Sequence, residues 1–536
     1  MPNIETILRD NVSLQIECVD RIYMNAYVPG VQRPGQLVYF LTNHRGNWLP
    51  SPALLRQMSD AFVASIKRFA EHNRIPIVQF RSGERKDEIA KRRYAQFRGD
   101  EGVVFIGVAQ ELDSVFRTKP RKGRSGKATF DFFRSKAAVN QYYFYIIDRE
   151  FGPGFIKLSS YAPFGGRVCL NGHEWAKCQL RKAGVTFEPL SNGFLSCAEP
   201  ERLQRICDRL DANDIERYFR KWLARLPHPF TAKDRKAGYR YRLSIWQMEF
   251  SLTQVFDKPL HGRQLFEELV RENLDLGRPD RIQLLFDRRI MRTGPSRTPS
   301  SFRTRVINNG VQPKLSVEYK HSKLKQYFKD NRALRTETTI NNAYDFDVRR
   351  DISKLPVLRD IARNINRRLI TLERTSHNCA ISKSTFESFV LPSDTSGQHV
   401  PGLRFGDPRV MALLLALCLF LPCADGLTNR LLRERVGALY DPGPKGYTAG
   451  RMTYDLRRLR LKGLIERLPH RSRYMLTPRG RRLALFLCKS YARIFRPGVA
   501  RLDPGLPDSA GDPLARAWRQ LDQAIDHEIK EAKLAA

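Results

Sequence analysis

Acidic residues are scarce in this chain. Its 536 residues include 56 Asp and Glu against 93 Lys and Arg, which gives a formal net charge of +37. Such a surplus excludes a typical cytosolic enzyme that acts on small molecules. It indicates a polyanionic partner, with nucleic acid the first choice and an anionic membrane surface the second.

Long hydrophobic runs and an N-terminal signal are also lacking. The longest apolar run, residues 410–421, has twelve residues and is shorter than a bilayer span. The stretch MPNIETILRDNVSLQ has no apolar core of the kind that directs secretion. We therefore expect no membrane partner. We interpret the nine scattered cysteines as reduced core residues of a cytoplasmic protein.

The motifs of several common enzyme classes are missing as well. There is no Gly-x4-Gly-Lys-Ser/Thr loop, no Gly-x-Ser-x-Gly elbow, no Gly-x-Gly-x-x-Gly fingerprint and no His-Glu-x-x-His pair. Cys169, His173 and Cys178 offer zinc-ligand chemistry, but close Cys-x2-Cys pairs, usual in structural zinc sites, are absent. The alternative is a half-buried cysteine on a helix. No cofactor is assured.

The patterns that are present predict an α+β multidomain chain. We expect strands at 14–23 and 36–41, a hairpin over YYFYIID and FIKLSSY, and a helix over 243–255. The expected segments are an α/β domain at 1–128, an aromatic-rich β-hairpin region at 129–198, a helical region at 199–280, an antiparallel β-meander with a helix at 281–376, a linker at 377–407, a winged helix-turn-helix at 408–500 and a C-terminal tail at 501–536.

The winged helix is predicted from the order of elements between residues 447 and 495. Thr448 is suited to an N-cap, and Met452, Leu456 and Leu459 follow at helical spacing. Two short apolar runs then flank a basic tip, and Thr477 with a following proline restarts a helix. The half GLIERL…RYMLTPRGRRLALFL resembles the winged helix-turn-helix of bacterial transcriptional regulators.

The charge of this segment indicates what it contacts. Residues 448–482 contain 11 Lys and Arg against two acids, a surplus of 9. A recognition helix offers Arg or Lys to bases and phosphates, and a wing reaches neighbouring phosphates. The alternative is a small helical domain that docks a protein and uses arginine for solubility. The side chains predicted to contact nucleic acid are Arg451, Tyr454, Arg457, Arg458, Lys462, Arg471 and Arg473.

The meander contains the most suggestive set of catalytic residue types. Tyr319, His321 and Tyr327 precede a strand that carries Glu337. A DNA-nicking enzyme needs a tyrosine to attack a phosphodiester and a carboxylate or histidine to hold a divalent metal. The local sequence resembles the tyrosine and Arg-x-Glu hairpin of rolling-circle replication initiators, although their His-hydrophobe-His pair is absent. The alternative is a basic sheet whose Tyr and Glu pair across strands.

A second acidic pair, Asp148 and Glu150, follows an apolar strand, with Lys157 on the next one. Acidic groups at strand ends hold metal ions in many nucleases. This pair is therefore the candidate site for Mg²⁺ or Mn²⁺ if the protein is a nuclease. A chain of this length also contains such pairs by chance.

Basic stretches outside the winged helix, at 119–127 and 288–305, favour a further alternative. An extended basic surface with exposed aromatics at 129–164 suits RNA or a single strand. The leading hypothesis is binding of duplex DNA; the alternatives are a metal-dependent nickase and an RNA-binding scaffold.

Most of the chain also resembles a widespread group of bacterial proteins described as hypothetical and associated with mobile elements. The stretches that carry the resemblance are GVVFIGVAQE, YFYIIDREFGPGFIK, NGHEWAKCQL, LDLGRPD and KQYFKDNRALRTETTINN, together with the winged-helix segment. The resemblance implies a shared architecture and a mobile-element context, and it transfers no catalytic residue.

Overall fold

The computed structural model describes residues 10–122, 128–263, 304–309, 312–330, 332–377, 381–395, 397–418, 427–440, 447–468, 472–491 and 513–531, with Leu8 and Phe266 as single positions. The fold is mixed α+β, as the sequence predicts. The chain divides into two compact units. The sheet unit comprises Thr6–Ile282 and Arg288–Arg367, and the C-terminal unit comprises Met1–Glu5, Gln283–Asp287 and Arg368–Ala536.

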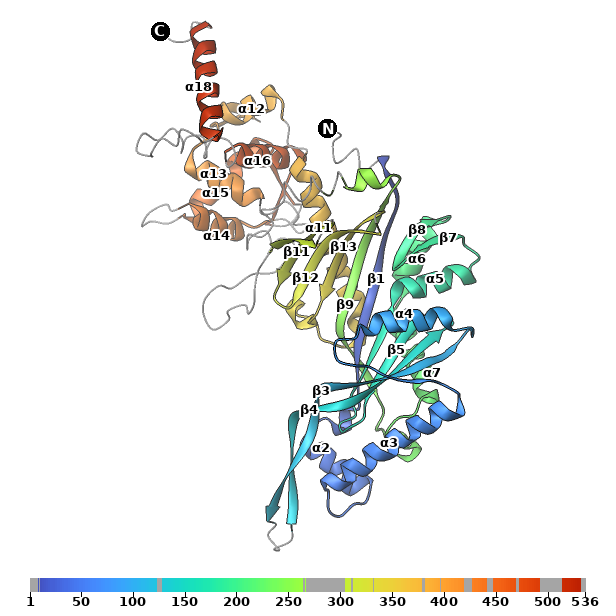
Figure 1. Ribbon diagram of the computed structural model, residues 1–536. Coiled ribbons are helices and arrows are strands. Elements are labelled where there is room, and N and C mark those ends of the chain that lie inside the picture. Colours follow the sequence, from blue (N-terminus) through green and yellow to red (C-terminus); the bar gives the residue numbers. More distant parts are fainter. Residues whose placement is uncertain are drawn as a thin grey trace. The chain divides into compact units, whose positions relative to one another are not determined.

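The sheet unit is built on one eleven-stranded sheet (Figure 1). Neighbouring strands are antiparallel except for the parallel pair at one edge, β2 with β3. In spatial order the strands are β10 (Thr304–Asn309), β11 (Gln312–Tyr319), β12 (Ser322–Lys329), β13 (Ala333–Ile340), β9 (Arg242–Phe256), β1 (Val12–Tyr27), β6 (Gly166–Asn171), β5 (Gly152–Ser159), β4 (Ala128–Asp148), β3 (Gly102–Lys122) and β2 (Ile77–Gln79).

The long strands β1 and β9 join the two halves of this sheet. β1 pairs with β9 along its whole length, and β9 continues into β13 and so into the predicted meander. The helix expected over 243–255 is therefore wrong. The segment LSIWQMEFSLTQVF is rich in β-branched and aromatic residues, which favour a strand buried between two neighbours. The strand expected at 36–41 is also wrong, because Pro34 opens helix α2 (Pro34–Tyr39) there.

One face of the sheet is covered by helices. On this covered face, Asn366 of α11 (Leu355–His377) accepts a hydrogen bond from Thr338 at 2.7 Å and donates to the Phe250 carbonyl at 3.1 Å. α3 (Pro52–His72) places Phe62 against Tyr142 with ring centroids 6.5 Å apart. α7 (Ala212–Arg225) packs on the same face.

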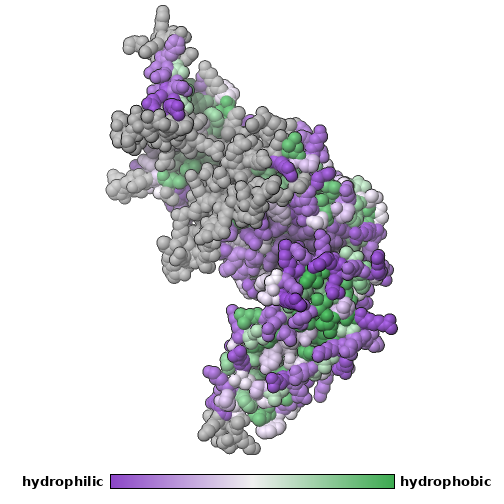
Figure 2. All heavy atoms as spheres, viewed as in Figure 1, coloured by the Kyte–Doolittle hydropathy of each residue, from purple (hydrophilic) through white to green (hydrophobic). Residues whose placement is uncertain are grey.

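The opposite face, which we call the polar face, carries Tyr143, Lys157, Arg167, Lys325 and Glu337 at paired positions on successive strands. Helix α4 (Lys86–Gln96) covers this face only over β3 to β5, where Ala90 packs with Phe105 and Tyr145. In Figure 2 hydrophilic residues predominate over the part formed by β12 and β13.

The remaining elements of the sheet unit are short or lie beside β1. They are η1 (Pro29–Val31), η2 (Phe40–His44), α5 (Gly172–Lys182), β7 (Phe187–Leu190), β8 (Gly193–Cys197), α6 (Pro200–Arg209), α8 (Ala232–Lys236), η4 (Ala343–Phe346) and η5 (Ile352–Lys354). α5 and α6 both pack on β1.

The C-terminal unit is mainly helical. Its elements are α12 (Lys383–Val390), β14 (Ser393–Thr395), β15 (Gln398–Val400), α13 (Pro408–Cys418), α14 (Asn429–Leu439), α15 (Ala449–Leu461), β16 (Ile465–Arg467), β17 (Tyr474–Leu476), α16 (Pro478–Ser490) and α18 (Pro513–Glu531). Thr428, Thr448 and Thr477 cap α14, α15 and α16 by accepting a backbone N–H. The two helix starts that the sequence marks at Thr448 and Thr477 are thus confirmed.

A short hairpin follows α15. β16 pairs with β17, and Leu427 forms a further bridge with Tyr474 on the other side. Gly480 lets α16 begin close to this hairpin, because a Cβ there would lie 2.0 Å from the Leu464 carbonyl oxygen. Among the described residues, no helix is long and apolar enough to cross a bilayer.

Candidate nucleic-acid interface and the predicted sites

The exposed side of α15 carries two arginines and a tyrosine three residues apart. Arg451, Tyr454 and Arg457 are exposed, and Tyr454 keeps 43% of its surface accessible. The opposite side of the helix, with Met452 and Leu456, is buried. Arg457 donates one hydrogen bond to the Gln398 side chain of β15 at 2.9 Å. α15 therefore presents guanidinium and phenol groups on a helix fixed from behind.

Arg458 and Lys462 point the other way. They keep only 6% and 7% of their surfaces exposed. Arg458 donates to the Gly402 carbonyl at 2.6 Å, and Lys462 donates to the carbonyls of Ser388 and Leu391 at 3.0 and 2.8 Å. These bonds tie the segment 388–402 to α15. Both side chains are therefore buried against segment 388–402 and do not lie on the exposed side of α15, contrary to the prediction.

The predicted wing arginines are placed only in part. Arg473 is half-buried next to β17, and its carbonyl accepts the Leu468 N–H at 2.9 Å. Arg471 lies outside the described residues.

In the meander, the fold brings Tyr327 and Glu337 together. The Tyr327 hydroxyl donates to Glu337 Oε2 at 3.0 Å, and Lys325 Nζ lies 3.4 Å from Oε1. All three side chains lie on the polar face because β12 and β13 pair Lys325 with Glu337 directly. Burial, with Glu337 adding to it, raises the pKa of Tyr327.

The neighbouring strands add acids and lysines to this part of the polar face. Burial, and then the charges of Glu337 and Asp20, raise the pKa of Glu249 on β9 to about 7. Burial, and then the charge of Lys325, lower the pKa of Lys314 and of Lys323. The lysines thus repel one another on a half-buried surface, which favours an anionic partner.

A fully buried arginine lies on the same face, directly opposite Tyr327. Arg335 is 0% exposed and donates to Asp20 at 2.5 Å, to Ser251 at 3.0 Å and to the Asn192 carbonyl. His173 Nε2 lies 2.9 Å from the same guanidinium. Burial lowers the pKa of His173, and the Arg335 charge adds to this. This network fixes α5 and the β7–β8 turn onto the sheet.

The other two predicted catalytic residues lie elsewhere. Tyr319 is fully buried on the covered face, because it alternates with Glu318, which pairs with Lys323 on the polar face. His321 lies in the turn before β12, with Nδ1 3.1 Å from Asp345. The four predicted residues therefore form one pair, Tyr327 with Glu337, and two separate positions.

Asp148 and Glu150 do not form a metal site. Asp148 is buried and accepts from Lys221 at 2.7 Å, from the Trp222 indole at 2.8 Å and from two backbone N–H groups. Glu150 pairs with Lys182 at 3.1 Å. Because the oxygens of Asp148 already hold the turn after β4 against α7, the residues present do not fit a divalent ion.

The predicted zinc ligands are also dispersed. Cys169 lies on β6 opposite Phe155 and Tyr23, His173 bonds Ser251 at 3.1 Å, and Cys178 lies further along α5. Within the part of the chain that the structure describes, no three His, Cys, Asp or Glu side chains are placed to hold a metal ion.

Sequence reasoning missed a second charged cluster on the polar face. Glu111 accepts from Tyr143 at 2.5 Å, from Lys157 at 3.0 Å and from Lys86. Burial by itself raises the pKa of Glu111, but these hydrogen bonds and the Lys157 charge lower it to about 2. The alternation of side chains along β3 to β5 indicates which residues of one strand share a face. It does not show which strands pair, so it could not bring Glu111 together with Tyr143 and Lys157.

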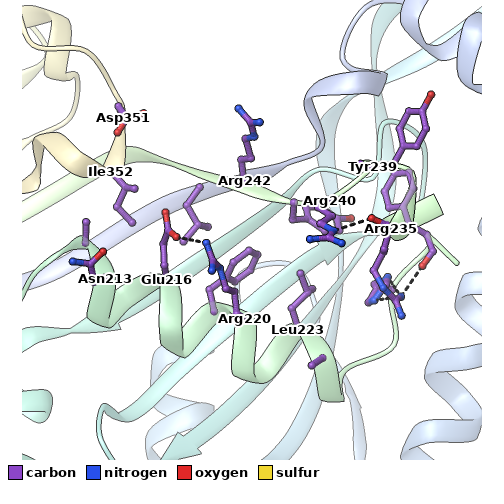
Figure 3. Close-up of a pocket in the computed structure, with 18 of the residues that line it drawn as sticks. Asn213, Glu216, Arg220, Leu223, Arg235, Tyr239, Arg240, Arg242, Asp351 and Ile352 are labelled. Carbon is purple, nitrogen blue, oxygen red and sulfur yellow. Dashed lines mark hydrogen bonds and ion pairs between the residues drawn. The ribbon is translucent and has the colours of Figure 1, made fainter. Parts of the chain in front are cut away.

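A hollow of about 1020 Å³ was also missed. It is lined by α7, the segment 228–243 and η5. In Figure 3, Glu216 and Arg220 of α7 lie near Ile352 and Asp351, and Arg235 with Arg240 borders the other end. Arg220 pairs with Glu216 at 2.7 Å, and Arg235 donates to His228 at 2.6 Å. Arg220 and Arg235 are thus engaged by neighbouring side chains of the fold.

No protein-family model matches the chain, and no curated protein or solved structure matches it either.

Proposed function

We propose that the protein binds duplex DNA through its C-terminal unit, which we interpret as a winged helix. In this proposal α14 and α15 form the helix-turn-helix, α15 is the recognition helix, and β16 with β17 forms the wing. The observation that carries the proposal is the exposed stripe of Arg451, Tyr454 and Arg457 opposite the buried side of α15. A recognition helix needs this division between a base-contacting side and a core side.

The net charge of +37 supports the same partner. Each phosphate neutralised by Lys or Arg releases counterions, so a strongly basic chain gains affinity for DNA at low salt. The described cysteines are free thiols, which suits work in the cytoplasm. A role in a mobile element belongs to the proposal on the resemblance alone.

The test is the double substitution Arg451→Gln and Arg457→Gln, measured by fluorescence anisotropy on a labelled 30-base-pair duplex over a salt series. The matched control is Arg202→Gln with Arg205→Gln, which removes the same charge from exposed positions on α6. Two lost phosphate contacts reduce the slope of log K against log salt by about 2, and base contacts weaken binding by about 10- to 100-fold. Equal binding by both variants would contradict the proposal.

A second candidate function, cleavage of DNA by a tyrosine nucleophile, is favoured by the contact between Tyr327 and Glu337 at 3.0 Å. In this step the phenol oxygen bonds to phosphorus, the phosphorus–oxygen bond to the sugar breaks, Glu337 takes the phenol proton, and the leaving sugar oxygen takes a proton from Lys325. Supercoiled plasmid with Mg²⁺ or Mn²⁺ is the substrate. Nicking that survives both Tyr327→Phe and Glu337→Gln eliminates this candidate.

A further inference from the structure

The strands β3 and β4 extend beyond the rest of the sheet as a two-stranded ribbon. They pair without a register shift from Phe105 with Tyr145 to Lys122 with Ala128. β5 covers β4 only over 141–148, and β2 covers β3 only over 77–79 with 106–108. Residues 113–121 and 129–137, which we call the ribbon, therefore have no third strand beside them, and Figure 1 shows them projecting from the sheet unit.

The base of the ribbon is held firmly. Val115 and Phe116 are 2% and 1% exposed, and the Phe116 N–H donates to the Ala162 carbonyl at 3.1 Å. The Arg134 guanidinium stacks on Phe116 at 4.8 Å, donates to the Gln32 carbonyl at 2.9 Å and donates to Ser114 Oγ at 3.0 Å. These contacts fix the direction of the ribbon, so a partner meets a pre-organised surface.

One face of the ribbon carries three exposed basic side chains. Alternation along β3 places Arg117, Lys119 and Arg121 on the same face, and all three are exposed. They stand about 7 Å apart along the strand. The opposite face carries Phe116 and Phe132, which pack at the base. The register also places Asp131 and Phe133 on the face with the three basic residues, and it places Arg134 and Lys136 on the opposite face.

The ribbon contains five basic residues and two acids, Asp113 and Asp131, which gives a net charge of +3. Asp131 lies 3.6 Å from Arg121, but both side chains are more than 60% exposed. Solvent weakens such a pair, so it neutralises little of the charge that faces outward.

We infer that this ribbon is a second DNA-binding element and that the face with Arg117, Lys119 and Arg121 enters the major groove of duplex DNA. A two-stranded ribbon fits the roughly 12 Å width of that groove in B-DNA. The major groove of an RNA helix is too deep and narrow to admit the ribbon, so the ribbon is expected to prefer a DNA duplex over an RNA duplex. The inference rests on the proposed function, to which it adds a contact in the sheet unit.

The experiment uses the full chain with the triple substitution Arg117→Gln, Lys119→Gln and Arg121→Gln. Binding to the labelled 30-base-pair DNA is measured over a salt series beside the wild type. The matched control is Arg202→Gln, Arg205→Gln and Arg220→Gln, which removes three charges from exposed positions on α6 and α7. We expect the ribbon variant to lower the slope of log K against log salt by about 2 to 3 and the affinity by at least about 10-fold. The control keeps the wild-type slope.

The outcomes separate the two proposals. If the wild-type chain does not bind the duplex, the proposed function fails. If the wild type binds and the ribbon variant equals the control, the inference about the ribbon is overturned while the proposed function stands. Tighter binding of an RNA duplex, or of vesicles with anionic lipid, that depends on the three ribbon residues also overturns it, because the partner would then be of another class.

Lysine footprinting on the wild-type chain avoids any effect of substitution on folding. The exposed Lys119 is acetylated with and without the DNA duplex, and the modified peptides are counted by mass spectrometry. We expect protection of Lys119 by at least about fivefold in the complex. Equal acetylation with and without DNA contradicts the inference, whatever the variants show.

Discussion

Replacing the buried Arg335 by methionine tests the packing that the sheet unit depends on. The guanidinium is 0% exposed and joins β13 to Asp20 on β1, to Ser251 on β9 and to the Asn192 carbonyl in the β7–β8 turn. Methionine fills much of the same volume but donates no hydrogen bond. The substitution therefore removes the charge and leaves the hydrophobic packing largely in place.

The expected cost follows from what remains behind. Asp20 is 2% exposed, and without Arg335 its carboxylate stays buried with the Asn192 amide as the remaining side-chain donor among the described residues. Breaking a buried ion pair by removing one partner costs about 3–5 kcal/mol. Asp20→Asn leaves Arg335 with Glu337, 3.9 Å from its Nε, as its remaining carboxylate partner, so it costs less than Arg335→Met. The double variant removes both charges. Its loss of unfolding free energy is therefore smaller, by at least about 2 kcal/mol, than the sum of the losses in the two single variants.

Urea unfolding followed by tryptophan fluorescence measures these free energies. Trp48, Trp175, Trp222 and Trp246 lie in the sheet unit, so the signal reports mainly on it. If the slope of the unfolding free energy against urea concentration is the same in all variants, they unfold by the same transition. Arg332→Met, three residues earlier and exposed, is the matched control and changes the stability by less than about 0.5 kcal/mol.

A cost of less than about 1 kcal/mol for Arg335→Met, or simple additivity of the costs of Arg335→Met and Asp20→Asn, would contradict this expectation. Either result means that the pair contributes little beyond the rest of the network.

Two further predictions concern Glu249 and Gly172. Since burial raises the folded pKa of Glu249 to about 7, above its unfolded value near 4.5, the folded state holds the proton longer. The wild type therefore loses stability as pH rises from about 4.5 to about 7, and Glu249→Gln removes roughly 2 kcal/mol of that loss. Urea titrations at several pH values measure the difference. Parallel pH profiles of stability for the wild type and the variant would refute this prediction. A Cβ on Gly172 would lie 2.2 Å from the Val19 carbonyl oxygen, so Gly172→Ala costs about 1–3 kcal/mol, whereas Gly35→Ala, which meets nothing within 4 Å, does not destabilise. Equal thermal midpoints for these two variants would contradict the clash.

The sequence by itself determined the local structure of the segments with clear caps and periodicity. Thr448 and the apolar stripe from Met452 to Leu459 are enough to place α15, since these signals act within one or two helical turns. The alternating strands of the meander were recognisable for the same reason. The segment that became β9 was not, because an apolar run between helices has the same local appearance as a buried helix, and only its pairing with β1 and β13 selects the strand.

Only the tertiary structure decided which charged side chains are available. Arg457 and Arg458 are neighbours in sequence, yet one is exposed and the other reaches a carbonyl at Gly402, 56 residues away. Tyr319 and Tyr327 occupy opposite faces of one hairpin, and Asp148 is saturated by Lys221 and Trp222 of a helix more than 70 residues on. Burial and hydrogen bonding of a charge depend on what the fold brings against it, and those partners lie far beyond the range of any local pattern.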